Sequence, residues 1–243
     1  MTASVCLLEV CVDSAASLQA ALDGGADRIE LCSALSLSGL TPSPGFMLRA
    51  ARQPLPAYAM IRPRAGDFCF SPAEIDMMRH DIDAARGAGL AGVALGATRP
   101  DGMPDEAALG RLVAHAKGLG LTLHRAFDVA PAPLAALDLA IALGFERVLT
   151  SGGATSALAG APQIRGLVAH AEGRISIMAG AGITAANVTS LVGATGVTEV
   201  HGSFSRKLPA VPGPKALSTL GFTADRLETD ADAVATARAA LGR

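Results

Sequence analysis

The feature that most constrains the fold of this chain is a short pattern that recurs four times along it. Each copy begins with a glycine, continues with two or three linking residues and ends in a strand-like run: Gly25–Cys32, Gly89–Gly96, Gly144–Ser151 and Gly196–Ser203. Each glycine stands where a preceding helix would end, because the left-handed cap of a helix favours glycine. The repeat therefore predicts that helices and strands alternate along the chain.

Four further strands are expected between these copies, at Leu7–Val12, Tyr58–Arg62, Leu121–Phe127 and Arg174–Met178. Helices are expected at Ala15–Leu22, Pro44–Arg52, Pro72–Arg86, Asp105–Leu119, Pro133–Leu143, Pro162–Ala171, Ala185–Val192 and Asp230–Leu241, with Lys207–Gly221 as a loop before the last one. Strict alternation indicates a parallel sheet covered by helices. Eight units favour a closed barrel over an open sheet. We therefore predict one α/β domain over residues 1–243, an eight-stranded TIM barrel.

Composition and charge narrow the classes of partner. The formal net charge is -2, and no cluster of Lys and Arg offers the concentrated positive charge that nucleic acid binding needs. No apolar stretch reaches the roughly eighteen residues of a membrane span. The apolar run Val5–Val12 carries Glu9 and lacks a basic flank, so it indicates a strand and not a signal peptide. We expect a cytoplasmic protein whose four cysteines are reduced.

Side-chain alternation along the expected strands turns charged groups toward the barrel axis. The inward set includes Glu9, Arg28, Glu30, Arg62, Arg64, His124, Asp128, Arg147, Glu199 and His201. Buried charges must pair or contact a ligand. Sites in this fold lie at the C-terminal ends of the strands, so Arg28, Arg147 and Glu199 are expected to brace the barrel from below. The same rule gives Arg62, Arg64, His124, Asp128 and His201 a functional role.

Two matched triplets, Glu9-Val-Cys11 and Glu30-Leu-Cys32, lie on strands expected to be neighbours. Neighbouring strands are about 4.8 Å apart, so the two thiols could approach one another. A pair of thiolates suits Cu(I). The alternative is that each cysteine is simply a small buried residue.

A glycine-rich turn follows the seventh expected strand. Barrels often bind phosphate at the turns after strands seven and eight, so Gly180, Gly182 and Ser203 are candidate anion-binding residues. A tight turn alone would also explain the glycines. Arg64, with Arg62, is a candidate clamp for carboxylate or phosphate. Glu9, Glu30, Asp128, His124 and His201 are candidate acid–base groups, with Arg62 as their catalytic partner.

Several runs together resemble the CutC copper-homeostasis family: Glu9–Ser14, Gly24–Cys32 with Leu37–Ser43, Met60–Phe68, His124–Asp128 and Leu149–Gly153. The resemblance covers nearly the whole chain. It implies a cytosolic β/α barrel that forms dimers or larger homo-oligomers and handles copper, with Cys11 and Cys32 as the Cu(I) ligands. This chain has Gly180-Ala-Gly-Ile183 where the family commonly has three glycines followed by isoleucine. The family also often carries an aromatic residue after a Phe-Cys pair, and Phe70 supplies it here.

Three hypotheses follow. The first is a copper-binding homeostasis protein that uses Cys11 and Cys32. The second is a barrel enzyme of the lyase, isomerase or hydrolase kind that acts on a small anionic or phosphorylated metabolite, because many acid–base groups converge. The third is a structural or partner-binding barrel, which would need an exposed apolar patch. Fold alone decides none of them.

Overall fold

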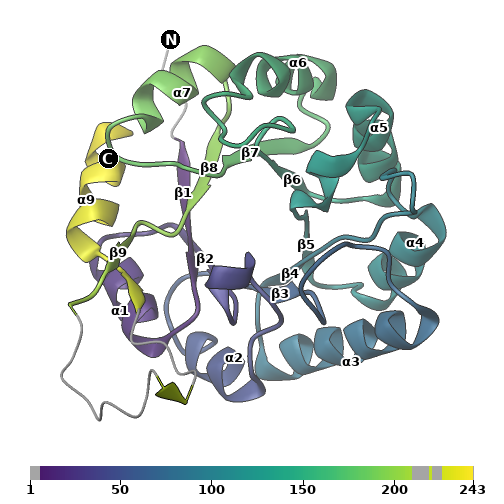
Figure 1. The fold of residues 1–243 in the computed structure, drawn as a ribbon, viewed down its shortest axis with the longest axis horizontal. Coiled ribbons are helices and arrows are strands. Elements are labelled where there is room, and N and C mark those ends of the chain that lie inside the picture. Colours follow the sequence, from purple (N-terminus) through teal and green to yellow (C-terminus); the bar gives the residue numbers. More distant parts are fainter. Residues whose placement is uncertain (1–5, 210–218, 221–225, 243) are drawn as a thin grey trace.

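The computed structural model describes residues 6–209, 219–220 and 226–242. Eight parallel strands close into one barrel in sequence order, which confirms the predicted TIM-barrel fold (Figure 1). They are β1 (Leu7–Val12), β2 (Arg28–Leu31), β3 (Ala57–Ile61), β4 (Gly92–Leu95), β5 (Gly120–Leu123), β6 (Arg147–Thr150), β7 (Ser176–Gly180) and β8 (Glu199–Gly202). Among the described residues, no helix combines the length and the apolar composition that a membrane crossing requires.

Helices form the outer ring of the barrel (Figure 1). They are α1 (Ala15–Asp23), α2 (Pro44–Ala50), α3 (Pro72–Ala88), α4 (Glu106–His115), α5 (Pro133–Leu143), α6 (Ala161–Ala171), α7 (Val188–Thr195) and α9 (Ala231–Ala240), with short 3-10 helices η1 (Leu35–Leu37) and η2 (Arg125–Val129). Side-chain caps begin several of them. Ser14, Asp105 and Asp230 cap α1, α4 and α9, and Ser71 forms a capping box with Glu74 at the start of α3.

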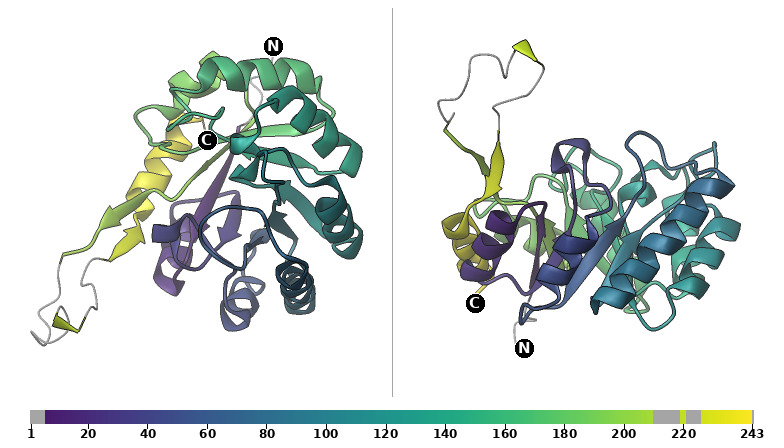
Figure 2. Two further views of the ribbon diagram at one scale, coloured as in Figure 1. Left: turned by 45° about the vertical axis from the view of Figure 1, so that its right-hand side comes forward. Right: turned by 90° about the horizontal axis from the view of Figure 1, so that it is seen from below.

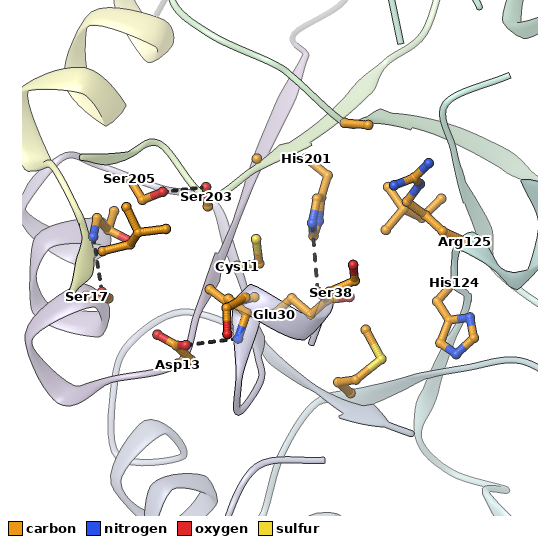
Figure 3. A pocket seen from close by; sticks show the side chains of 18 of the residues that line it. Cys11, Asp13, Ser17, Glu30, Ser38, His124, Arg125, His201, Ser203 and Ser205 are labelled. Atoms are coloured by element: carbon orange, nitrogen blue, oxygen red, sulfur yellow. Dashed lines mark hydrogen bonds and ion pairs between the residues drawn. The ribbon is translucent and has the colours of Figure 1, made fainter. Parts of the chain in front are cut away.

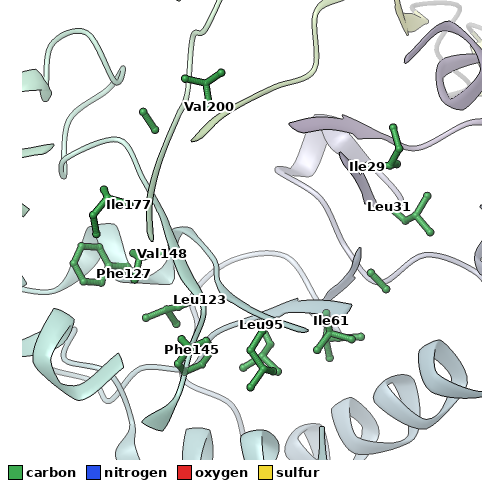
Figure 4. Close-up of a cluster of buried hydrophobic side chains, with 14 of the residues drawn as sticks. Ile29, Leu31, Ile61, Leu95, Leu123, Phe127, Phe145, Val148, Ile177 and Val200 are labelled. Atoms are coloured by element: carbon green, nitrogen blue, oxygen red, sulfur yellow. The ribbon is translucent and has the colours of Figure 1, made fainter. Parts of the chain in front are cut away.

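The apolar core lies between the strands and the helices, and the charged side chains point the other way. Figure 4 shows Ile29, Leu31, Leu95, Val148 and Val200 within this core, and each is at most 1% exposed. Since successive side chains on a strand face opposite sides, the intervening residues face the axis. The predicted alternation is therefore confirmed for these strands.

Several expected elements have other bounds than the sequence indicates, and two of these differences concern loops that line the cavity. Strand β5 stops at Leu123, and the chain then turns into η2, so Asp128 does not lie on a strand. The alternation Thr122, His124, Ala126 imitates a strand, but the Ala126 N–H donates to Nδ1 of His124 and bends the backbone. Helix α7 begins after Asn187, whose side chain accepts from the Thr184 N–H, and not at Ala185.

A two-stranded antiparallel sheet follows the barrel. Strand β9 (Ser205–Lys207) pairs with β10 (Leu227–Thr229) and projects beside α1 and α9 (Figure 2). The Thr229 N–H donates to Oγ of Ser17 on α1 over 3.1 Å, which ties β10 to the barrel. The expected loop Lys207–Gly221 is thus wrong at Lys207, while residues 210–218 and 221 lie outside the described part of the chain.

Candidate functional site

A cavity of about 1130 Å³ opens at the C-terminal ends of the strands. Its lining comes from the ends or following loops of β1, β2, β3, β5, β6, β7 and β8, and from the β9–β10 sheet. This is the face where sites in β/α barrels lie. Figure 3 shows the side chains of Cys11, Glu30 and His201 directed toward one another within this cavity.

Three side chains converge at the floor of the cavity because of the strand register. Cys11 on β1 lies opposite Glu30 on β2, and His201 on β8 lies opposite Glu9 on β1. The Cys11 thiol, a Glu30 carboxylate oxygen and an imidazole nitrogen of His201 all lie within 4.8 Å of one another. Thiolate, carboxylate and imidazole are all groups that bind transition metals.

Buried neighbours set the protonation states of Glu9 and His201 at the floor of the cavity. Nδ1 of His201 lies 2.7 Å from Oε1 of Glu9. Burial alone would raise the pKa of Glu9, but the Arg28 guanidinium and the His201 hydrogen bond outweigh it and hold the pKa at about 2. Burial would lower the pKa of His201, but Cys11, Glu30 and Glu9 together raise it well above its usual value. An imidazolium held by an ionised carboxylate therefore faces the thiol.

Glu30 has an unsatisfied oxygen. Burial raises the pKa of Glu30 above its usual value, although the His201 imidazolium opposes the rise. Oε2 of Glu30 accepts from the Cys32 thiol over 3.5 Å, whereas buried Oε1 has no partner among the described residues. A buried carboxylate oxygen without a partner is costly, so this atom marks a place where a cation or donor group of a ligand would be stabilised.

An ion-pair layer closes the barrel beneath the floor. Arg28 pairs with both Glu9 and Glu199, and the pair Arg147–Glu199 adds a contact of 3.3 Å. The centroid of the Tyr58 ring lies 5.5 Å from the guanidinium of Arg28 and 4.8 Å from that of Arg147. Arg28, Arg147 and Glu199 thus brace the barrel, as their position on the strands predicts.

Cys32 lies beside the converging group and not in it. It is 1% exposed, is absent from the cavity lining, and packs against Gly39, where an added Cβ would come 2.9 Å from the sulfur. The register pairs Cys11 with Glu30, and Cys32 follows two residues later, just past the end of β2. Burial and the neighbouring Glu30 raise the pKa of the Cys32 thiol well above its usual value.

One wall of the cavity contains a buried arginine without a carboxylate. Arg62 donates to three backbone carbonyls, those of Leu37, Gly39 and Gly66, over 2.9–3.1 Å. Its guanidinium lies 5.0 Å from the centroid of the Phe68 ring. No acidic group among the described residues lies within 4.0 Å of it, unlike Arg28 and Arg147. Arg62 therefore ties two loops to the mouth and leaves a positive charge in the wall.

His124 also packs against Phe68, with the centroids of the two rings 5.2 Å apart. Burial and the positive charge of Arg62 lower the pKa of His124 to about 3, so the ring is neutral near pH 7. Since Nδ1 accepts the Ala126 N–H, the ring proton lies on Nε2. That buried Nε2 has no partner among the described residues.

The Asp128 carboxylate accepts hydrogen bonds from several neighbours. Its carboxylate accepts from the hydroxyls of Thr150 and Ser151, from the N–H groups of Ser151 and Gly153, and from Arg125 over 2.8 Å. It joins η2 to the end of β6. The structure thus gives Asp128 a positioning role, although it lines the cavity.

Arg64 and Gly180, which the sequence suggests as anion-binding residues, lie outside the cavity lining. Arg64 is paired with Glu74 and Asp67 and stacks on Phe70 at 5.1 Å, so its charge is neutralised beside α3. An added Cβ at Gly180 would come 2.6 Å from Cδ1 of Leu149, so this glycine makes room inside the barrel. Gly182 and Ser203 do line the cavity.

Sequence reasoning did not single out many residues of the lining, and two of these contact the candidate residues. Arg125 is exposed there and donates to Oγ of Ser151 over 3.0 Å. Phe68 contacts both the Arg62 guanidinium and the His124 ring. Both belong to sequence segments that were singled out. Their side-chain directions depend on the turn after β5 and the loop after β3, which the sequence pattern does not predict.

Known proteins resemble the chain over most of its length. A "family protein CutC" of Caulobacter vibrioides strain NA1000 / CB15N is 54% identical over 242 residues, which cover 99% of each chain. Its namesake in Sinorhizobium medicae strain WSM419 is 54% identical over 97% of this chain and 96% of that one. The crystal structure of CutC from Streptococcus agalactiae superposes with a TM-score of 0.78 at 32% identity, covering 82% of this chain and 98% of that one.

More distant structures share the fold alone. The phosphoribosylanthranilate isomerase of Thermotoga maritima superposes with a TM-score of 0.58 at 13% identity, over 98% of each chain. The model of the CutC family matches residues 6–206, which contain all eight barrel strands and every converging residue at the cavity floor. This chain therefore belongs to the CutC family.

Proposed function

We propose that the protein takes part in copper handling by binding Cu(I) at the floor of the cavity. The observation that carries this is the convergence of the Cys11 thiol, the Glu30 carboxylate and the His201 imidazole within 4.8 Å. The unpartnered Oε1 of Glu30 adds a place for positive charge. The relative from Streptococcus agalactiae is named for copper homeostasis, which agrees with this proposal.

Two ligand sets compete within this proposal, and both contain Cys11. The sequence favours Cys32 as the second ligand, because Cu(I) prefers thiolates. The arrangement of the side chains favours His201, which faces Cys11 and would release a ring proton when it binds Cu(I), while the Cys32 thiol is engaged with Glu30. Glu30 is a hard ligand and serves better as a neighbouring negative charge for a bound ion.

An anaerobic competition titration against a chromophoric Cu(I) chelator tests the proposal. Cys11→Ser should weaken binding by at least about 100-fold, or about 2.7 kcal/mol, because both sets lose their shared ligand. If His201→Gln weakens binding as much and Cys32→Ser does not, the mixed set is correct; the reverse result supports the two thiolates. Cys69→Ser is the matched control, because Cys69 lies outside the cavity lining. Equal binding by wild type and Cys11→Ser would refute the proposal.

A second function is favoured by the size of the cavity. A cavity of about 1130 Å³ is far larger than an ion needs and matches that of a drug-sized ligand. We propose, as the alternative, an enzyme that acts on a small anionic metabolite, with Glu30 and His201 moving protons and Arg62 supplying positive charge. A melting-temperature screen of small carboxylates and phosphate esters should yield hits that Arg62→Gln abolishes. A screen without hits on folded wild-type protein would exclude this function.

A further inference from the structure

The loop after β7 has the backbone geometry of an anion-binding site. Ala181 and Gly182 are consecutive residues with positive φ, 82° and 72°. Successive N–H groups in such turns point into one concavity and attract negative charge. Within the described part of the chain, the N–H groups of Gly182 and Ile183 donate no hydrogen bond, and both residues line the cavity.

The same molecule contains an occupied version of this turn. In the loop after β6, Gly152 and Gly153 also have consecutive positive φ values, 72° and 69°. There the N–H groups of Ser151 and Gly153 donate to the Asp128 carboxylate over 3.0 Å and 3.3 Å. An internal carboxylate thus fills the β6 turn, whereas no acidic side chain among the described residues accepts from the β7 turn.

The end of β8 and the sheet after it supply further groups. The Ser203 N–H also donates no hydrogen bond within the described residues, and the Ser203 hydroxyl lies 3.0 Å from that of Ser205. Ser203, Ser205, Lys207 and Arg226 all line the cavity. Two backbone loops and two hydroxyls therefore meet at this side of the mouth, as Figure 3 shows for Ser203 and Ser205. Arg226 is paired over 3.6 Å with Glu228, which lines the same cavity, so the backbone N–H groups and the hydroxyls are the main donors here.

Two independent groups in the opposite wall indicate that the ligand is larger than the anion itself. Among the described residues, no carboxylate pairs with the buried charge of Arg62, and no acceptor contacts the buried Nε2 donor of His124. Both residues line the same cavity, which a phosphate group alone would leave mostly empty. Polar groups in the wall of such a cavity fix the orientation of an organic ligand.

We infer that the cavity binds a small phosphomonoester, with its phosphate at the N–H groups of Gly182, Ile183 and Ser203. The organic part extends over Glu30 and His201 toward Arg62 and His124. This inference rests on the proposed enzyme and names its substrate class; it is independent of copper. A phosphate fits better than a carboxylate because three oxygens can accept from several donors at once.

Amide chemical shifts test the inference on the wild-type chain without any substitution. Adding ribose 5-phosphate to nitrogen-15-labelled protein should move the amide proton signals of Gly182, Ile183 and Ser203 downfield. The signals of Gly152 and Gly153 should stay in place, because Asp128 already occupies that turn. Ribose without phosphate should leave all five unchanged. Inorganic phosphate should give the same shifts at higher concentration.

A charge substitution supplies the second measurement. Ser203→Asp places a carboxylate beside the phosphate and should weaken ribose 5-phosphate binding by at least about tenfold in calorimetry. Ser190→Asp is the control, because Ser190 is exposed on α7 and absent from the cavity lining. Both variants are first compared with wild type by circular dichroism.

The outcomes separate the two ideas. The inference is wrong if these amide signals do not move with any phosphate ester, or if they move with inorganic phosphate alone. If the melting-temperature screen then gives only carboxylates as hits, the proposed enzyme function is retained and its phosphomonoester substrate class is rejected. If neither measurement shows a ligand, both the enzyme and its substrate class are excluded.

Discussion

At the scale of single residues, glycines decide where the largest interior side chains can lie. A Cβ added at Gly92 or Gly120 would come 2.2 Å from the Tyr58 ring or hydroxyl, so two glycines on β4 and β5 make room for this tyrosine. Gly96 does the same for His124, whose ring atoms would lie 2.6 Å from a Cβ. Short strands with glycine therefore serve the site by leaving space for side chains from neighbouring strands.

Gly120→Ala should destabilise the protein by roughly 3 kcal/mol, the upper end of the usual range for a methyl group added to a well-packed core. The Tyr58 hydroxyl is the closest atom to the new methyl group, so Tyr58→Phe should recover about a third of this loss. Denaturant unfolding of both single variants and the double variant measures the coupling. Gly110→Ala on α4 is the control: its nearest neighbour would be 3.9 Å away, so it should be neutral or stabilising. Additive effects in the double variant would contradict this account of Gly120.

At the scale of elements, the connection from β5 through η2 to β6 shapes the cavity. Asp128 joins the two elements through five hydrogen-bond donors, and His124 begins the turn by accepting the Ala126 N–H. The sequence predicts both residues as functional but places them on a continuing strand. The pattern of alternating side chains cannot reveal such a turn, because a 3-10 helix of five residues is too short to show a repeating pattern of apolar residues.

Asp128→Ala should lower the free energy of unfolding by about 3 kcal/mol, because it leaves several buried donors and the Arg125 charge without an acceptor. Denaturant unfolding measures the loss. The comparison is Asp101→Ala, which removes an exposed carboxylate paired with Arg99 and should cost less than about 1 kcal/mol. Equal losses in the two variants would show that Asp128 does not join η2 to β6.

At the scale of the whole molecule, the barrel is apolar toward its helices and charged toward its axis. This division could be predicted from alternation alone, as could the closed barrel and the bracing role of Arg28 and Arg147. The partner of each charged side chain could not be predicted, because the strand register decides it. Glu30 belongs to the converging group, whereas Cys32, two residues later and just past β2, lies beside it. The β9–β10 sheet was also missed, since three exposed residues such as Ser205–Lys207 show no apolar pattern.

The buried histidine makes stability depend on pH. His124 has its pKa lowered to about 3 in the folded chain, so between that pH and 6.5 only the unfolded chain takes up its proton. Stability from this residue is therefore full above pH 6.5 and falls as pH falls. From about pH 7 to about pH 5, the wild type should lose about 2 kcal/mol more than His124→Asn.

Denaturant unfolding at the two pH values gives this difference directly. His80→Asn, at an exposed position on α3, should follow the wild type. A wild type and a His124→Asn variant with the same pH dependence would mean that His124 is not kept neutral by the fold.

Tyr58 and the guanidiniums of Arg28 and Arg147 fill the barrel beneath the cavity floor, at the end of the strands away from the mouth. A ligand that enters through the mouth and goes to the floor must therefore arrive before any ligand that stops above it. An ion held by Cys11 would then stay covered for as long as a larger molecule sits above it, whatever its own affinity. For ligands that use the mouth, the depth of the cavity imposes an order of arrival and departure, in which the first ligand to enter is the last to leave.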